Sequence, residues 1–227
     1  MKKLGILLIT LTLSFLLTGC SRKDERVEEQ VDLLGINFNI EGNESTLDFD
    51  TENPLVALYI ENYGAVVIEL FPRVAPSTVN NFITLVQEGF YDDNTFHRLV
   101  RGFVLQGGDP TGTGMGGAEY NIRGEFESNG FTNDLGHNRG VVSMARSFDL
   151  DSASSQFFIM LGDANSLNGD YAAFGRVIAG MHNVDRIERN ERVADQDSGN
   201  LENNLTLRKA LVDLNGFTVG EIDRVRR

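Results

Sequence analysis

The sequence predicts a mainly β protein built on a closed antiparallel sheet or sandwich with one or two helices. Short β-type segments recur between turns rich in Gly, Asn and Asp, which is the spacing of barrels and sandwiches. Clear amphipathic helical spacing is confined to a few short stretches. The composition, with 41% hydrophobic residues, 23% charged residues and only four Pro in 227, is that of a folded globular chain.

The β segments begin with an expected hairpin. Residues 55–60 (LVALYI) and 65–70 (AVVIEL) are rich in apolar and β-branched side chains. Residues 61–64 (ENYG) between them have the composition of a turn. We therefore expect the two runs to pair as neighbouring antiparallel strands.

A helix is expected after Pro76. Ser77 or Thr78 is placed to cap its N-terminus, and Gly89 is placed to end it. The apolar residues between follow the i, i+3, i+4, i+7 spacing of a helix with one buried face: Val79, Phe82, Ile83 and Val86.

The rest of the domain is predicted to be mainly β. A second helix is expected at residues 181–189, and the acidic segment 188–202 is expected to be a solvated loop. Further β segments are expected at residues 103–105, 140–145, 156–161 and 173–178, with a last strand at 205–214.

The N-terminus has the sequence pattern of an export signal. Lys2 and Lys3 precede an apolar run over residues 4–17, which is too short for a comfortable membrane span of about 20 residues. The following L-T-G-C resembles a bacterial lipobox, and this resemblance implies cleavage before Cys20 and diacylglyceryl attachment to its thiol. We expect residues 1–19 to be a lipoprotein signal peptide and the mature chain to be lipid-anchored on the extracytoplasmic face of the cell membrane.

A tether separates the anchor from the domain. Residues 20–53 are mostly polar, which favours a flexible N-terminal extension. The apolar stretch 31–40 (VDLLGINFNI) leaves open whether part of the tether docks on the domain. We expect residues 54–227 to form the folded domain, as a monomer.

Charge and composition exclude several classes of function. A net charge of -13 and a pI near 4.6 argue against a nucleic-acid partner. The single Cys excludes an internal disulfide and a thiolate metal cage. The three histidines, His97, His137 and His182, lie too far apart for a short metal-binding motif. No metal or cofactor is expected.

The densest chemical information lies around Arg98. The guanidinium of Arg98 is a permanent planar cation, and Phe103, Gln106 and, later, Phe158 follow it in the sequence. An X-Pro amide suits such surroundings, because its ring favours an apolar pocket and its amide favours donors. Rotation about that bond needs no bond making or breaking, only weaker amide resonance.

Several motifs together resemble the cyclophilin family of peptidyl-prolyl cis/trans isomerases. The resemblance covers about residues 54–217 and implies a closed antiparallel β-barrel capped by two helices, with isomerase activity and no cofactor. The motifs are residues 96–110 (FHRLVRGFVLQGGDP), 112–117 (GTGMGG), 143–146 (SMAR), 154–159 (SSQFFI) and 174–177 (FGRV).

The resemblance implies a role for particular residues. Arg98 matches the catalytic arginine of the family's F-H-R motif. Ala145 and Arg146 match positions whose backbone faces the residue before proline. The other expected substrate-binding residues are those of the proline pocket and its surroundings: Phe103, Val104, Gln106, Gln156, Phe158, Leu167 and Tyr171.

The chain departs from the family at one wall of this site. Ser166 stands where many eukaryotic members have Trp, and Tyr171 stands where they have His. The chain contains no Trp, so the indole donor that helps sensitive members bind cyclosporin is absent. We therefore expect weak cyclosporin binding together with intact activity.

Alternative functions receive less support. Gly112, Gly114 and Gly117 satisfy G-x-G-x-x-G, but no strand and helix pattern surrounds them, so a dinucleotide site is not expected. A hydrolase triad of His137 with Asp149 or Asp151 and Ser152 lacks the sequence setting of a nucleophile. Two functions remain: an isomerase acting on exported proline-containing polypeptides, and a chaperone or scaffold that binds proline segments with incidental turnover.

Overall fold

The computed structural model describes residues 52–226. The predicted signal peptide, Cys20 and most of the predicted tether lie outside the described residues, so those predictions stay untested. Within residues 52–226, no helix is long and apolar enough to cross a bilayer.

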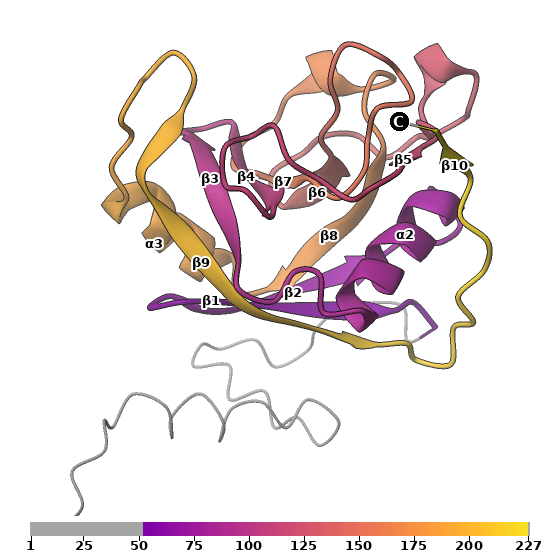
Figure 1. Ribbon diagram of the computed structural model, residues 1–227, viewed down its shortest axis with the longest axis horizontal. Helices are drawn as coiled ribbons and strands as arrows, with labels where there is room; N and C mark the ends of the chain where they lie inside the picture. The colour runs from indigo at the N-terminus through magenta and orange to yellow at the C-terminus, as the bar shows by residue number, and fades with distance from the viewer. Residues whose placement is uncertain (1–51, 227) are drawn as a thin grey trace, which may run out of the picture. The chain divides into compact units, whose positions relative to one another are not determined.

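Eight antiparallel strands close into a barrel in the order β1-β2-β8-β6-β7-β4-β3-β9 (Figure 1). Closure depends on the long strand β9, which pairs with β1 along one edge and with β3 along the other. The predicted closed β-barrel is confirmed. The barrel strands are β1 (Leu55–Ile60), β2 (Gly64–Leu70), β3 (Asn94–Val100), β4 (Val104–Asp109), β6 (Val141–Met144), β7 (Phe157–Met160), β8 (Ala173–Ala179) and β9 (Asn200–Asp213).

Within residues 52–226, two α-helices pack beside the barrel, in agreement with the predicted pair of capping helices, and they lie on opposite sides of it in Figure 1. They are α2 (Pro76–Gln87) and α3 (Met181–Asn190). Single-turn 3₁₀ helices occur at η1 (Glu127–Asn129) and η2 (Asn165–Leu167). Near the C-terminus, β10 (Arg224–Val225) pairs with β5 (Asn121–Ile122) as a separate small sheet.

The first hairpin follows its prediction closely. Leu55 pairs with Glu69 and Ile60 pairs with Gly64 across β1 and β2. The turn requires left-handed backbone at Asn62 (φ 67°) and Gly64 (φ 101°), which Asn and Gly tolerate best.

The N-terminus of α2 is capped differently from the prediction. The helix begins at Pro76, and neither Ser77 nor Thr78 acts as an N-cap with its side chain. Instead, their backbone N–H groups donate to the buried carboxylate of Glu125, at 3.0 and 2.8 Å. A negative charge satisfies free donors and favours the positive end of the helix dipole. Because Glu125 is 47 residues away in the chain, local sequence rules do not reveal this cap.

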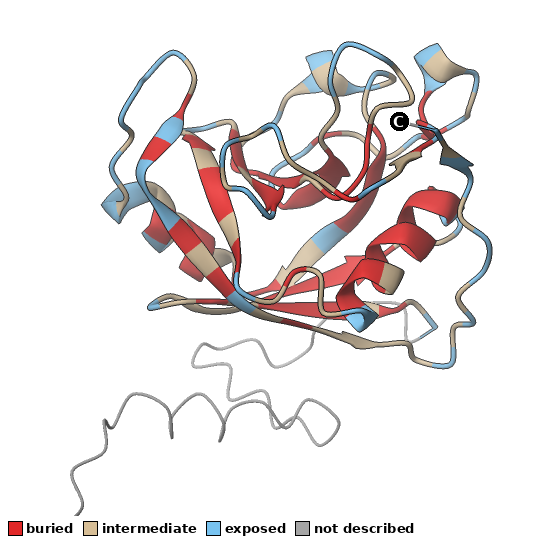
Figure 2. Cartoon of the chain, viewed as in Figure 1, coloured by how far each residue is buried: buried red, intermediate tan, exposed pale blue. Residues whose placement is uncertain are grey.

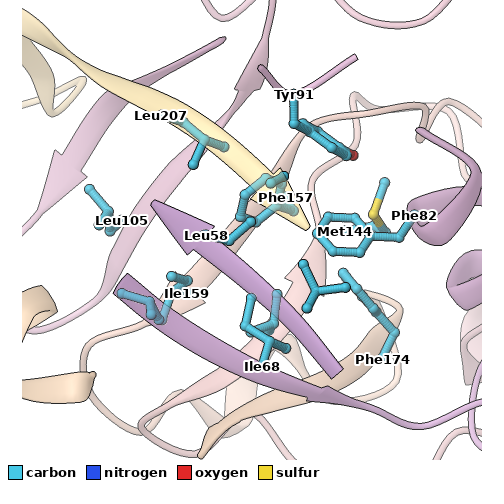
Figure 3. Packing of buried hydrophobic residues seen from close by; sticks show 14 of the residues in the cluster. Leu58, Ile68, Phe82, Tyr91, Leu105, Met144, Phe157, Ile159, Phe174 and Leu207 are labelled. Carbon is cyan, nitrogen blue, oxygen red and sulfur yellow. The ribbon is translucent and has the colours of Figure 1, made fainter. Parts of the chain in front are cut away.

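The barrel interior is filled by buried hydrophobic side chains (Figure 3), and every barrel strand contributes buried residues to it (Figure 2). Phe157 lies at the centre of an aromatic group, with its ring 5.3 Å from Phe82 and 5.6 Å from Tyr91, both edge to face. The apolar residues predicted for α2 are fully buried against this core, except Val86, which is 4% exposed. The core therefore joins α2 to the strands.

Strand β3 was not predicted, and a β-bulge explains why. Phe96 pairs with Gly107 of β4 and Arg98 pairs with Gln106, so β3 contains one extra residue, His97. The extra residue breaks the alternation of buried and exposed side chains, because Phe96 and His97 are both buried. A second register shift between Thr95 and Phe96 compensates for the bulge, so Arg98 lies across from Gln106 in the same register as Thr95 with Asp109.

The prediction of a solvated loop at residues 188–202 is wrong at both ends. Helix α3 continues to Asn190 and β9 already begins at Asn200. The segment between them packs on β3, where Leu99 N–H donates to the Gly199 carbonyl at 2.8 Å. Backbone pairing across strands overrides the polar composition here.

Candidate active site

A second apolar cluster lies on the outer face of β4, β6, β7 and β8, apart from the barrel core. We call it the outer cluster. Strand alternation creates it, because Phe157 and Ile159 point into the barrel while Phe158 and Met160 point outward. It contains buried Val104, Val141, Phe158, Met160 and Ala173 and the partly exposed side chains of Val100, Phe103, Leu135, Ala145, Ala164, Leu167 and Tyr171.

Most predicted substrate-binding side chains meet in this outer cluster. Phe103, Val104, Ala145, Phe158, Leu167 and Tyr171 all belong to it. They come from residues 103 to 171 of the chain, so only the closed sheet and its loops bring them together.

Strand register places the predicted catalytic residue in line with this cluster. Arg98 on β3 is across from Gln106 on β4, and Gln106 is across from Phe158 on β7. Phe158 is in turn across from Ser143 on β6. A cation, an amide, an aromatic ring and a hydroxyl thus form one row across four neighbouring strands.

A chain of hydrogen bonds holds the polar end of the row. Arg98 Nη1 donates to Gln106 Oε1 at 3.1 Å, and Gln106 Nε2 donates to Gln156 Oε1 at 2.9 Å. Gln156 Nε2 donates to the carbonyl oxygens of Gly114 (3.0 Å) and Gly116 (2.8 Å). Because carbonyls only accept, they fix the orientation of both amides and turn the Gln106 oxygen toward the guanidinium.

The guanidinium of Arg98 is held at a second nitrogen. Its Nε donates to the Ser198 carbonyl oxygen at 2.7 Å. Among residues 52–226, Nη2 has no hydrogen-bond partner and remains a donor. Burial lowers the pKa of Arg98, and the nearby Tyr171 opposes that shift, but an arginine keeps its charge in a protein.

Tyr171 and Arg146 form one side of the site. The Tyr171 ring lies 5.9 Å from Phe158, edge to face. The Arg146 guanidinium stacks at 4.7 Å over Tyr171 and donates from Nε to the Asp170 carbonyl. Ala145 N–H donates to the Gln156 carbonyl at 2.9 Å, whereas within residues 52–226 the backbone N–H of Arg146 has no partner.

The glycine-rich loop is organised around Asp109, which is fully buried. Its carboxylate accepts hydrogen bonds from the N–H groups of Thr111, Thr113 and Gly114. Burial alone would raise the pKa of Asp109, but these hydrogen bonds lower it to about 2. The N–H donors of the loop therefore bind the Asp109 carboxylate, and Gly112 (φ 65°) and Gly114 (φ 83°) supply the left-handed backbone of the loop.

His137 and Ser152 do not form a hydrolase triad. His137 contacts Ser143 and Asn168, and Ser152 donates to the Asp149 backbone carbonyl. Ser143 is fully buried, so its pairing with His137 presents no nucleophile. In residues 52–226, no group of three His, Cys, Asp or Glu side chains is placed to hold a metal ion.

Sequence reasoning missed three contributors to the site. Asp109 had a signal, because Asp followed by Thr and Gly residues is typical of turns closed by the carboxylate. Ser198 acts through its backbone carbonyl, which no side-chain pattern reveals. His137 had no local signal, since its partners come from β6 and from the residue after η2.

Fold and site together define a class of protein: a closed antiparallel barrel whose outer face carries a guanidinium, two amides and an apolar cluster in one row. The family model described as cyclophilin type peptidyl-prolyl cis-trans isomerase/CLD matches residues 55–212. The chain belongs to this family, which confirms the resemblance indicated by the motifs.

Known relatives agree with this assignment. The chain is 46% identical over 122 residues to peptidyl-prolyl cis-trans isomerase B of Bacillus subtilis, an alignment covering 54% of this chain and 82% of that protein. It is 44% identical over 116 residues to a peptidyl-prolyl cis-trans isomerase of Helicobacter pylori, covering 51% of this chain and 68% of that one. The predicted class of enzyme is thereby confirmed at the level of the family.

Solved structures agree as well. The fold is similar to a cyclophilin type peptidyl-prolyl cis-trans isomerase of Cryptosporidium parvum in the presence of the dipeptide Ala-Pro. The TM-score is 0.62 at 32% identity, covering 70% of this chain and 98% of that chain.

Proposed function

We propose that this chain accelerates cis/trans rotation of X-Pro bonds in exported polypeptides, with Arg98 hydrogen bonding to the prolyl amide. The single observation that carries the proposal is the row from Arg98 through Gln106 to Phe158, fixed by strand register. This row sets a directed cation beside an apolar surface, the combination that an X-Pro unit needs.

The prolyl ring would pack on the outer cluster, against Phe103, Phe158 and Leu167. These side chains favour an apolar ring and exclude water from the neighbouring amide. The substrate backbone would lie along Gln106 and Arg146, with the Arg146 N–H as a donor to the residue before proline. Binding then orients the amide toward the guanidinium.

Rate acceleration would come from preferential binding of the twisted amide. Rotation is opposed by a resonance barrier of about 18 to 20 kcal/mol. As the bond twists, electron density localises on nitrogen, and a fixed donor such as Arg98 Nη2 stabilises that state more than the planar one. A ten-thousand-fold acceleration needs about 5.4 kcal/mol. One charge-assisted hydrogen bond together with orientation and exclusion of water supplies energy of this size.

We further propose that the mature chain is a lipoprotein anchored through Cys20 on the extracytoplasmic face of the membrane. The L-T-G-C sequence after a short apolar run supports this. Wild-type chain should fractionate with membranes, and Cys20→Ser should be released from them. Membrane retention of Cys20→Ser at the wild-type level would contradict lipid anchoring.

NMR exchange between the cis and trans forms of a short Ala-Pro peptide tests the isomerase. The full chain is compared with Arg98→Ala and with Arg73→Ala, whose side chain is 87% exposed. We expect fast exchange with wild type and Arg73→Ala, and a loss of about a hundred-fold or more in kcat/KM with Arg98→Ala. Peptide that binds but exchanges no faster than free peptide would favour the chaperone or scaffold function.

Cyclosporin binding provides a separate test of the site's specificity. Ser166 and Tyr171 stand where many eukaryotic members of the family have Trp and His, and the chain contains no Trp to supply an indole donor. We expect a weak complex by isothermal titration, and a submicromolar Kd would contradict this.

A further inference from the structure

His137 is a buried ionisable side chain at the outer cluster that the proposed mechanism does not use. Only 1% of it is exposed. Its ring stacks on Phe158 with centroids 6.1 Å apart, and it meets Tyr171 edge-on at 6.4 Å. It therefore lies directly behind two of the expected substrate contacts.

The hydrogen bonds of His137 define its tautomer. The backbone N–H of His137 donates to Oδ1 of Asn168 at 2.8 Å, so that atom must be the amide oxygen. The same oxygen lies 3.0 Å from ring Nδ1, which therefore carries a hydrogen and donates. Ring Nε2 is 3.0 Å from Ser143 Oγ and, in the neutral ring, accepts the hydroxyl proton.

These two bonds join the two halves of the outer cluster. Ser143 belongs to β6 and is across from Phe158, so it is part of the sheet face. Asn168 directly follows η2, which carries Leu167, and precedes Tyr171 in the same loop. One imidazole thus ties the loop-borne contacts Leu167 and Tyr171 to the strand-borne contact Phe158.

We propose that His137 is a positioning residue for the prolyl substrate: its neutral ring holds the loop of residues 165–171 against the sheet, and its protonation weakens substrate binding. This inference rests on the proposed function, because it concerns the same site. Protonation would place a hydrogen on Nε2, so Ser143 must reverse its hydroxyl and a cation must be buried behind Phe158.

Burial lowers the pKa of His137 below its ordinary value of 6.5, and the hydrogen bond with Asn168 opposes that shift. The ring is therefore neutral near neutral pH and becomes charged as the pH falls. Neither cause of the shift is a neighbouring charge. The ionisable groups nearest the ring are Tyr171, which meets it edge-on, and Arg146, which stacks over Tyr171 and donates to the backbone carbonyl of Asp170. Close to His137 in the chain, the Arg139 N–H donates to Asp163 and the Arg139 guanidinium pairs with Asp185.

The test measures Kd for a short Ala-Pro peptide by NMR titration of the full chain, from about pH 8 to about pH 5. The His137 ring is titrated by NMR in the same samples. We expect Kd to rise with protonation of this ring. His137→Gln, which stays uncharged, should raise Kd about five-fold near neutral pH and remove the pH dependence, with a smaller change in kcat. His182→Gln, an exposed histidine on α3, is the matched control and should behave as wild type.

Several outcomes would overturn the inference. A wild-type Kd that stays constant while the His137 ring titrates would contradict the inference by itself. This result does not depend on the folding of any variant. A His137→Gln variant with wild-type Kd, or with the wild-type pH dependence of Kd, has the same meaning. Burial also lowers the pKa of His97, which adjoins Arg98. A pH dependence caused by His97 would appear in kcat and would remain in the His137→Gln variant. Exchange no faster than free peptide at neutral pH would instead contradict the proposed function.

Discussion

Arg98 and Gln106 face each other across β3 and β4, with Nη1 of the arginine 3.1 Å from Oε1 of the glutamine. This pair has the same register as Leu99 with Leu105 and Val100 with Val104 further along the two strands. With Nε bonded to Ser198, two of the three guanidinium nitrogens are occupied. These two bonds restrict the orientation of the side chain that the proposed mechanism uses.

Removing Gln106 should reduce catalysis more than folding. In Gln106→Ala, the guanidinium loses one of its two anchors and samples unproductive orientations, so we expect kcat to fall about ten-fold. Gln87→Ala, an exposed glutamine at the end of α2, is the control. NMR exchange kinetics measure both, and an unchanged kcat in Gln106→Ala would show that this bond does not orient Arg98.

The loop before β9 should control the same arginine. Gly199 has φ 76°, and a Cβ there would lie 2.6 Å from Val100 Cγ2 and 2.9 Å from the Leu99 carbonyl. Gly199→Ala must therefore move the Ser198 carbonyl away from Arg98, and we expect a loss of about ten-fold or more in kcat. Gly130 also has φ 76° but has no atom within 4 Å of its Cβ position, so Gly130→Ala is a control for backbone strain alone. Equal kcat values in the two variants would contradict the role of Ser198.

Asp109 should make stability depend on pH in acid. Its pKa is about 2 in the folded protein against 3.8 in the unfolded chain, which corresponds to about 2 kcal/mol. Because the folded-state pKa is depressed, this stabilisation is complete above about pH 4 and is lost as the pH falls toward 2. Urea unfolding should show Asp109→Asn less stable than wild type near neutral pH, with a gap that narrows in acid.

The control for this prediction is Asp134→Asn, because Asp134 is an exposed carboxylate. Its free energy of unfolding should differ from wild type by less than about 0.5 kcal/mol. A gap between Asp109→Asn and wild type that is the same near neutral pH and near pH 3 would contradict the hydrogen-bonded, ionised state of Asp109.

The distant cap on α2 should contribute measurably to stability. Glu125→Ala leaves the Ser77 and Thr78 N–H groups without their buried acceptor, so the free energy of unfolding should fall by about 2 kcal/mol. Glu127→Ala, an exposed glutamate two residues along, should change it by less than about 0.5 kcal/mol. Similar unfolding midpoints for the two variants would show that water replaces the carboxylate at no cost.

Much of the fold was predictable because its signals are local. The hairpin of β1 and β2, helix α2, and strands β6, β7 and β8 were predicted to within about one residue at most ends. The candidate site was predictable for a different reason, since the motifs around Arg98, Gln156 and Phe158 identified the family. Local signals failed at β3 and at the start of β9, where a bulge and cross-strand pairing replace regular alternation.

The sequence by itself determined the periodicities, the family motifs and the residues that meet in the outer cluster. Only the tertiary structure decided how they meet. Closure of the barrel sets Arg98, Gln106, Phe158 and Ser143 in one row, and it brings His137 behind that row. The physical reason is that hydrogen-bond register and buried polar contacts join residues far apart in the chain, whereas sequence patterns report only the preferences of neighbours.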